Sequence, residues 1–91
     1  MTYALVFTPG YERVEKRFLR RHPELRRLYR KTLRLLEADP FHPSLRLHPL
    51  QGRLAGLHSA SINLSYRITL ELLIENGQIL PINVGDHDAV Y

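Results

Sequence analysis

The spacing of hydrophobic residues changes once along the chain, from a helical repeat in the first half to a repeat of two after Gly52. An apolar run at residues 3–7 precedes the helical region and predicts a first β-strand. Thr8 can cap a helix that follows, and Pro9 suits the first helical turn, where no backbone N–H is needed. The chain is therefore expected to begin with a strand and continue into a helix.

Two predicted helices follow, each with one apolar face at helical spacing. The first ends at His22, because Pro23 disfavours a helical conformation in the residue before it. The second starts at Pro23 and ends at residues 38–40, Ala-Asp-Pro. The first apolar face comprises Tyr11, Val14 and Phe18, and the second comprises Leu25, Leu28, Tyr29, Thr32, Leu35 and Leu36. Because the link is so short, the helices should form an antiparallel hairpin.

A loop and two strands are predicted next. Residues 41–51 (FHPSLRLHPLQ) are interrupted by prolines and predict an ordered loop. Residues 57–62 predict a strand. Residues 66–75 alternate apolar and polar side chains, which is the clearest strand pattern in the chain.

A hairpin is expected to close the sheet. Asn76-Gly77 is the strongest short hairpin signal, so residues 78–84 should return as a strand, in which Pro81 indicates an edge position or a bulge. The predicted fold class is α+β with element order β-α-α-β-β-β, in a single domain spanning residues 1–91. A small, twisted, mainly antiparallel sheet is covered on one face by the helical hairpin. The other face should be partly open to a partner.

The hairpin also predicts which polar residues lie side by side. A two-residue turn at residues 76–77 places Arg67 opposite Asp86, and a one-residue bulge would place His87 there instead. If the preceding turn spans three residues, Ser61 lies across from Arg67 on its other side. This register predicts a polar row of Ser61, Arg67 and either Asp86 or His87.

Charge is unevenly distributed along the sequence. Residues 1–53 hold 12 of the 13 Lys and Arg residues and five acidic residues, so the two parts carry about +7 and −3, with a pI of 9.9. A basic part of this size indicates a polyanionic partner, either nucleic acid, the ribosome or an acidic protein segment, although a solvated helix face is the simpler explanation. The candidate nucleic-acid-binding residues are Arg13, Lys16, Arg17, Arg20, Arg26, Arg30, Lys31 and Arg53.

Composition excludes several other classes. An apolar content of 44% in 91 residues suits one core and is too high for a disordered chain. The absence of cysteine excludes disulfides and fits a reducing compartment. The N-terminal apolar run is too short for a signal or membrane segment, so a cytoplasmic protein without a membrane partner is expected. The histidines lack the spacing of a known zinc motif, so neither a metal site nor a cofactor is expected.

The remaining chemistry is phosphodiester cleavage without metal. RNA carries its own nucleophile, the 2′-hydroxyl, so an enzyme needs a base, an acid for the leaving oxygen and a cation for the phosphate. Histidine can fill either proton-transfer role near neutral pH, and arginine binds phosphate oxygens bidentately. His48, His87 and Arg67 supply this minimum set. Asp86 and Asp88 flank His87 and favour its charged form, which suits the acid and leaves His48 as the base.

Each of these residues also has an ordinary structural explanation. Arg67 can form a surface ion pair with Asp86 or Glu71, and such pairs are common and weak. His48 can hold a turn in the proline-rich loop. His87 can make a hydrogen bond near the chain end.

Three segments in order, HPLQGRLAGLHSASI, SYRITLEL and INVGDHDAVY, resemble blocks of the RelE/ParE superfamily of bacterial type II toxins. The resemblance is strongest to its RelE/StbE and YafQ-type mRNA interferases, and the basic helical hairpin before the blocks fits the same pattern. It implies a small α/β fold and ribosome-dependent cleavage of mRNA without metal. It also implies neutralisation by a cognate antitoxin protein.

The resemblance also carries individual roles to this chain. His48 of HPLQG and His87 of GDHDAVY match histidines that YafQ-type toxins use in catalysis. Arg67 of SYRI matches the arginine that RelE-type members place at the scissile phosphate. Tyr91 is a weaker match, because the terminal aromatic residue varies in the family.

The chain departs from the YafQ pattern at three positions. Ser65 stands in place of a catalytic aspartate, Ser61 in place of another histidine, and Asp86 in place of the usual threonine. A RelE-like set of residues centred on Arg67 is therefore expected to contribute more to catalysis. The supporting residues of the candidate site are Ser61, Ser65, Asp86, Asp88 and Tyr91.

Three rival functions remain open at this stage. A gyrase-inhibiting toxin of the ParE branch shares the fold and needs no acid–base histidines. A non-catalytic RNA- or ribosome-binding module needs only the basic helices. An inactive homologue would be kept for its contact with the antitoxin. Neither the oligomeric state nor the sequence preference follows from the sequence.

Overall fold

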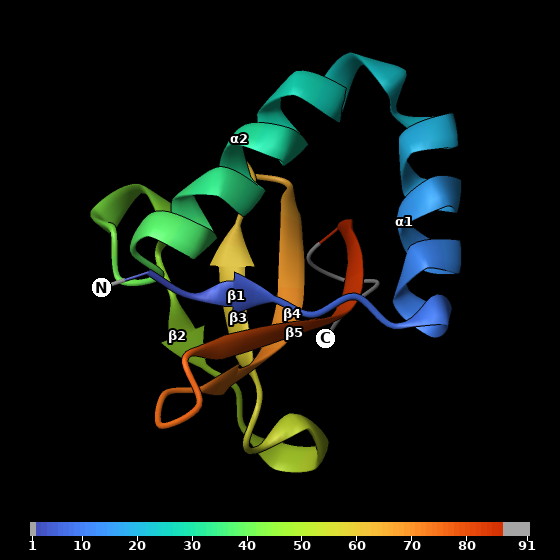
Figure 1. Cartoon of the computed structure of the whole chain (residues 1–91). Coiled ribbons are helices and arrows are strands. Elements are labelled where there is room, and N and C mark those ends of the chain that lie inside the picture. The colour runs from blue at the N-terminus through green and yellow to red at the C-terminus, as the bar shows by residue number, and fades with distance from the viewer. Residues whose placement is uncertain (1, 87–91) are drawn as a thin grey trace.

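Two helices lie on one face of a five-stranded sheet in the computed structural model, which describes residues 2–86 (Figure 1). The strand order is β1-β5-β4-β3-β2, with β1 parallel to β5 and the other neighbours antiparallel. The main elements are β1 (Ala4–Leu5), α1 (Pro9–Arg21), α2 (Arg26–Ala38), β2 (His48–Pro49), β3 (His58–Ser61), β4 (Tyr66–Leu73) and β5 (Gln78–Asp86). Short 3-10 helices occur at η1 (Pro23–Leu25), η2 (Pro43–Leu45) and η3 (Gly52–Leu54). The predicted α+β class is confirmed.

The ends of α1 form as the sequence predicts. The Thr8 hydroxyl accepts a hydrogen bond from the Tyr11 backbone N–H at 3.1 Å, and Pro9 occupies the first helical position. At the other end, the His22 N–H bonds to the carbonyl of Phe18. The second helix starts at Arg26 rather than at Pro23, because residues 23–25 form the tighter turn of η1.

The helical hairpin is open, and the two helices form an arch that meets at η1 (Figure 1). Helix α1 packs on β5, whereas α2 packs on β1 and η2. Aromatic side chains fill the inside of the arch. The Phe18 and Tyr29 ring centroids are 6.1 Å apart, and the Tyr11 and Tyr29 hydroxyls are hydrogen-bonded at 2.7 Å.

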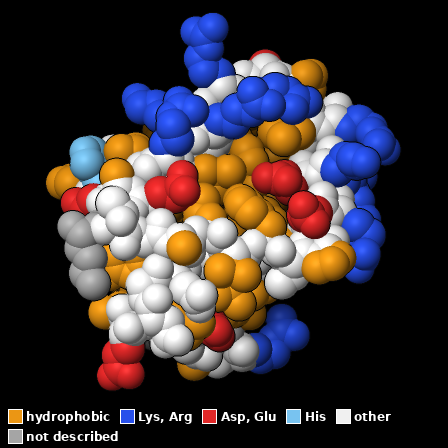
Figure 2. Space-filling view, in the orientation of Figure 1, with side chains coloured by type: hydrophobic (Ala, Val, Ile, Leu, Met, Phe, Trp, Pro, Cys, Tyr) orange, Lys and Arg blue, Asp and Glu red, His pale blue; other side chains and the backbone are white. Residues whose placement is uncertain are grey.

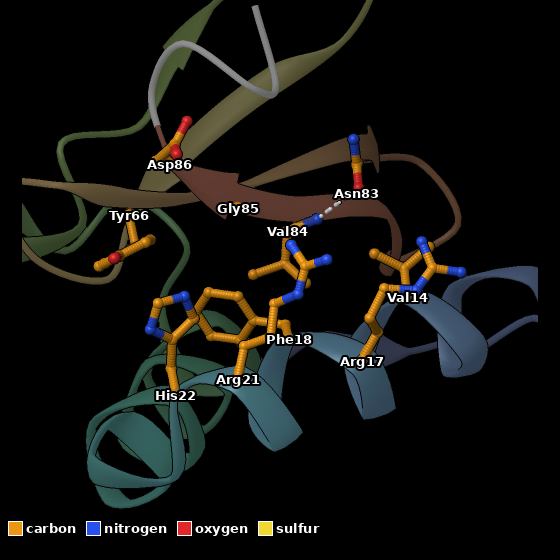
Figure 3. A pocket seen from close by; sticks show the side chains of 10 residues that line it. All are labelled: Val14, Arg17, Phe18, Arg21, His22, Tyr66, Asn83, Val84, Gly85 and Asp86. Atoms are coloured by element: carbon orange, nitrogen blue, oxygen red, sulfur yellow. Dashed lines mark hydrogen bonds between the residues drawn. The ribbon is translucent and has the colours of Figure 1, made fainter.

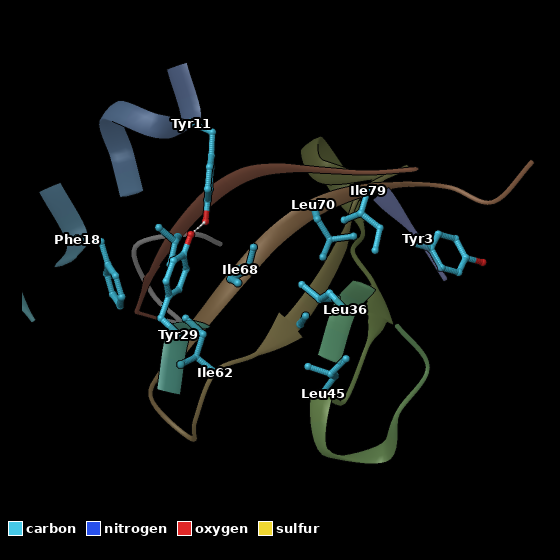
Figure 4. Packing of buried hydrophobic residues seen from close by; sticks show 12 residues of the cluster. Tyr3, Tyr11, Phe18, Tyr29, Leu36, Leu45, Ile62, Ile68, Leu70 and Ile79 are labelled. Atoms are coloured by element: carbon cyan, nitrogen blue, oxygen red, sulfur yellow. Dashed lines mark hydrogen bonds between the residues drawn. The ribbon is translucent and has the colours of Figure 1, made fainter. Parts of the chain in front are cut away.

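The core lies between α2 and the helix-facing side of the sheet (Figure 4). Leu36 from α2 is fully buried against Ile68 and Leu70 of β4 and Ile79 of β5. Leu45 of η2 closes the core beside α2. The proline-rich stretch at residues 41–51 is therefore ordered, as predicted, and it also contains the two-residue edge strand β2, which the sequence did not indicate.

The predicted register of the last hairpin is wrong. Leu73 pairs with Gln78, so the connection contains four residues rather than two, with Gly77 in the left-handed region at φ 62°. A bulge next to Pro81 then shifts the pairing by one residue. As a result, Arg67 lies opposite Gly85 and not opposite Asp86 or His87.

The predicted pairing on the other side of β4 is correct, because Ser61 of β3 lies opposite Arg67. Pro81 is confirmed as a bulge position rather than as part of an edge strand, since β5 lies between β1 and β4. The two residues of β1 pair only with the start of β5, so the missing N–H of Pro81 disrupts no bond to β1.

Candidate active site

Polar residues form two aligned rows on the sheet face opposite the helices. In the first row, His48 pairs with Ser59, Ser59 with Thr69, and Thr69 with Asn83. In the second row, Ser61 pairs with Arg67 and Arg67 with Gly85. Paired residues on neighbouring strands share a face, and alternate residues of β4 point to opposite faces. His48 and Arg67 therefore lie on one face, with core residues such as Ile68 on the other.

The two candidate catalytic side chains in this region come from separate strands. His48 on β2 and Arg67 on β4 are two strand spacings apart across the sheet and two residues apart along the strands. At about 4.8 Å per strand spacing and 3.4 Å per residue, their Cα atoms are roughly 12 Å apart. Both side chains are half-buried. His48 and Arg67 are long enough to approach one substrate group from two sides.

His48 is held in a defined orientation by its own loop. Its Nδ1 is 3.0 Å from the carbonyl oxygen of Arg46. A carbonyl only accepts hydrogen bonds, so Nδ1 donates, and Nε2 is the acceptor nitrogen of the neutral ring. Arg46 itself adopts a left-handed conformation, with φ 48°, which turns the chain from η2 into β2. This geometry suits a histidine that accepts a proton at Nε2.

Ser61 and Ser65 have structural roles in the β3–β4 turn. The Ser61 hydroxyl donates to the carbonyl of Asn63 at 2.7 Å. The Asn63 side-chain oxygen accepts from the backbone N–H groups of Ser65 and Tyr66, both at 2.8 Å. Ser61 is buried, whereas Ser65 is exposed. The turn therefore uses the Ser61 hydroxyl and the Ser65 backbone to position the start of β4.

Two neighbouring residues in the middle of this face are buried in the described part of the chain. Thr69 is buried, and its hydroxyl makes no hydrogen bond there. Ser59, its neighbour on β3, is also buried. The middle of this sheet face is therefore closed, whereas His48, Arg67 and Asn83 around it are half-buried.

The terminal segment of the candidate site is only partly covered by the structure. Asp86 is the last residue described, and it pairs with Tyr66, whose side chain points to the opposite face from that of Arg67. His87, Asp88 and Tyr91 lie outside the described residues. Their predicted roles therefore stay predictions.

The basic residues of α1 and α2 are exposed and gather along the outer sides of both helices (Figure 2). No Lys or Arg of these helices forms an ion pair with another residue in the range 2–86. Arg53 is also exposed, on η3. The predicted basic surface is present, with the charges available to a partner.

A hollow that the sequence did not indicate lies between α1 and the end of β5 (Figure 3). Its volume is about 250 Å³. Arg17, Arg21 and His22 line it from the helix side, and Tyr66 and Asp86 line it from the strands. In the sequence, His22 indicated only the end of a helix, because the strand residues that line the hollow with it, such as Tyr66 and Asp86, are more than 40 residues away in the chain.

Residues 2–86 contain neither a candidate metal site nor a candidate membrane-spanning helix. No cluster of three His, Asp or Glu side chains there could hold a metal ion. No helix in this range is both long and apolar enough to cross a membrane.

No protein-family model and no curated protein sequence matches the chain. Solved structures do match over nearly the whole length. YafQ from E. coli strain BL21(DE3) has a TM-score of 0.79 at 16% identity, covering 98% of both chains. A YoeB/ParE toxin from Agrobacterium tumefaciens has a TM-score of 0.72 at 21% identity, covering 92% of this chain and 98% of the other.

The toxin–antitoxin complex RelBE2 from Mycobacterium tuberculosis also matches, with a TM-score of 0.67 at 22% identity over 96% of this chain and 100% of the other. The Agrobacterium protein is described as a toxin and RelBE2 as a toxin–antitoxin complex, and YafQ also occurs in the E. coli DinJ–YafQ toxin–antitoxin complex, which matches with a TM-score of 0.77 at 18% identity over 100% of this chain and 99% of the other. The chain therefore has the fold of the RelE/ParE toxin superfamily. The fold implied by the sequence resemblance is confirmed.

Proposed function

We propose that the chain is the toxin of a type II toxin–antitoxin system and cleaves mRNA on the ribosome without a metal ion. The observation that carries the proposal is the placement of His48 and Arg67 on one sheet face, with His48 held so that Nε2 is its acceptor nitrogen. The RelE-like fold supports the same conclusion.

The proposed reaction uses the 2′-hydroxyl of the RNA as the nucleophile. His48 Nε2 takes the hydroxyl proton, and the 2′-oxygen forms a bond to phosphorus. The bond from phosphorus to the 5′-oxygen breaks as His87 gives that oxygen a proton. The products are a cyclic 2′,3′-phosphate and a free 5′-hydroxyl.

Arg67 stabilises the charge that develops on the phosphate. A guanidinium stays charged at any working pH and can donate two parallel hydrogen bonds to the non-bridging oxygens. Ser61 opposite Arg67 is small, and its hydroxyl is held by the Asn63 carbonyl. The proposal assigns phosphate binding on this row to Arg67 rather than to Ser61.

The proposed partners are an antitoxin and the ribosome. RelBE2 was solved as a toxin–antitoxin complex, and we infer that this chain is also neutralised by a protein partner. The exposed Lys and Arg side chains of α1 and α2 suit the acidic side chains of such a partner as well as ribosomal RNA. Ribosomes would bring the toxin to translated mRNA in the cytoplasm.

The test is induction of the protein in a host without antitoxin, followed by mapping of mRNA 5′ ends and of DNA breaks. Cuts inside translated frames, with 5′-hydroxyl ends, are the expected result. Intact mRNA with gyrase-linked DNA breaks would replace the proposal with the ParE-like function. Ribosome binding without cuts would favour the non-catalytic module.

A further inference from the structure

We propose that the hollow between α1 and the end of β5 binds one nucleotide of the RNA, with Arg17 and Arg21 on its phosphate and His22 against its base. This inference rests on the proposed action on RNA. It adds a binding site that is separate from the sheet face of His48 and Arg67.

Two guanidinium groups reach the hollow from one side of α1. Arg17 and Arg21 are four residues apart, so their side chains lie one above the other on the helix. Figure 3 shows both extending from α1 toward β5, where Val84 and Gly85 complete the wall. Neither forms an ion pair with a residue in the described range. Two cations placed this way form a site for an anion that offers several oxygens, such as a phosphate.

The adjoining wall is aromatic. The His22 ring centroid is 4.7 Å from that of Tyr66 and 5.0 Å from that of Phe18, and Phe18 meets Tyr66 edge-on at 5.6 Å. This packing fixes the imidazole while 26% of its side chain stays exposed. A fixed, partly exposed ring beside cations is the arrangement on which nucleic-acid-binding proteins stack bases.

The carboxylates near the hollow limit where an anion can bind. Asp86 lies at its rim and is exposed, and Glu24 is 3.5 Å from the His22 Nδ1. Both would repel a phosphate, so the phosphate is expected beside Arg17 and Arg21, with the uncharged base toward His22. The hollow is smaller than pockets that enclose drug-sized ligands, which suits one nucleotide of a longer strand.

A structural explanation exists for the basic end of α1, and it provides the control. Cations in the last helical turn stabilise a helix by complementing its dipole, and both Arg20 and Arg21 lie there. Arg20 is exposed and does not line the hollow. Arg20→Gln therefore controls for the helix dipole in the thermal melts. Because Arg20 is itself a candidate nucleic-acid-binding residue, the binding control is Arg27→Gln, which removes one exposed charge from α2 outside the hollow.

The experiment measures fluorescence anisotropy of a labelled single-stranded RNA whose 2′-positions are methylated, so that it cannot be cleaved. We expect Arg17→Gln and Arg21→Gln each to weaken binding about tenfold, the loss typical of one charge-assisted contact. Arg27→Gln should change binding less than about twofold. His22→Ala should weaken binding, and His22→Phe should keep it, because phenylalanine preserves the stacking surface. Thermal melts of each variant confirm that it is folded.

Equal losses in Arg27→Gln and Arg21→Gln would overturn the site, because diffuse charge would then explain binding. The nucleotide site would also be overturned if Arg17→Gln and Arg21→Gln weakened binding of an acidic peptide but not of RNA. That result would indicate a protein partner for the hollow. Cleavage by the unmodified protein is measured separately on programmed ribosomes. If the protein does not cleave but Arg17 and Arg21 still bind RNA selectively, the proposed function fails while the nucleotide site stands.

Discussion

Ser61 on β3 lies directly opposite Arg67 on β4, and the Ser61 hydroxyl donates its hydrogen bond to the carbonyl of Asn63. The serine therefore holds the turn before β4, and the proposed phosphate binding on this row falls to the arginine. Arg67 is also the only Lys or Arg after residue 53 in the sequence. This arrangement makes Arg67 the first residue to test.

We expect Arg67→Ala to abolish toxicity while the protein stays folded. Arg67 is half-buried, so its loss should cost about 1 kcal/mol and shift the melting temperature by about 4–8 °C. Arg67→Lys should also reduce cleavage, because an ammonium lacks the paired donors of a guanidinium. Growth after induction and a thermal melt measure the two effects.

Arg34→Ala is the control for Arg67→Ala, because it removes one charge from an exposed position on α2. It should leave toxicity unchanged. A variant at Arg67 that unfolds would instead assign that residue a structural role.

The second prediction concerns His48. His48→Gln removes the proton acceptor at Nε2, and cleavage on programmed ribosomes should fall about 100-fold, within the range for loss of a general base. The Michaelis constant should change little, because the group acts mainly in the transition state. His42→Gln is a matched control at the N-cap of η2, where the ring accepts a hydrogen bond from the Ser44 N–H at 3.2 Å. Equal effects of the two substitutions would remove His48 from the mechanism.

The period of the hydrophobic residues was enough to predict both helices, the strands β3, β4 and β5, and the face of β4 that carries Arg67. It could not predict the pairing of Arg67 with Gly85, because that depends on a four-residue turn and a bulge that each shift the register. The local signal at Asn76-Gly77 favoured a two-residue turn, but the chain places only Gly77 in the left-handed region. A one-residue error of this kind changes which side chain faces the candidate site.

Two other features depend on contacts between distant parts of the chain. The strand β2 is two residues long and forms only because β3 pairs with it, so no periodicity could reveal it. The hollow beside His22 exists because α1 meets the ends of β4 and β5. The acid–base chemistry of their side chains singled out His48 and Arg67 in the sequence, but only the observed strand pairing places them on the same face of the sheet.

The third prediction concerns the buried hydrogen bonds inside the helical arch. Tyr29 donates to a carboxylate oxygen of Glu15 at 2.7 Å and is bonded to the Tyr11 hydroxyl at 2.7 Å. Because Tyr29 gives its proton to Glu15, Tyr11 donates to Tyr29. Tyr29→Phe therefore leaves the buried Tyr11 hydroxyl without its partner, whereas Tyr11→Phe leaves the bond to Glu15 intact.

We expect Tyr29→Phe to lower the free energy of unfolding by about 1–3 kcal/mol and Tyr11→Phe by about 0.5–1.5 kcal/mol. Denaturant titration of the two variants and the unmodified protein measures the difference. The reverse order would show that the Tyr11 hydroxyl finds another partner.

The fourth prediction is a loss of stability at high pH. Burial is the main cause that raises the pKa of Tyr11 and of Tyr29 far above the ordinary value of about 10. Above pH 10 the unfolded chain loses these protons while the folded chain keeps them, so stability falls as pH rises. The contribution is complete below about pH 10 and falls by about 1.4 kcal/mol per pH unit for each phenol.

Unfolding by urea between pH 9 and pH 12 tests the loss of stability at high pH. The double variant Tyr11→Phe/Tyr29→Phe should show a shallower decline above pH 10 than the unmodified protein. An identical decline in both would assign the effect to other groups.

The last prediction concerns the terminal segment GDHDAVY, of which His87 and Asp88 lie outside the described residues. If His87 is the proton donor, His87→Gln should lower the cleavage rate on programmed ribosomes far more than it weakens ribosome binding. The rate should follow a bell-shaped pH profile, because one histidine must be neutral and the other charged. Cleavage should also survive EDTA when ribosome integrity is maintained. Loss of cleavage with the chelator, restored by a divalent ion, would instead make Asp86, His87 and Asp88 metal ligands, and full activity of His87→Gln would leave the segment without a catalytic role.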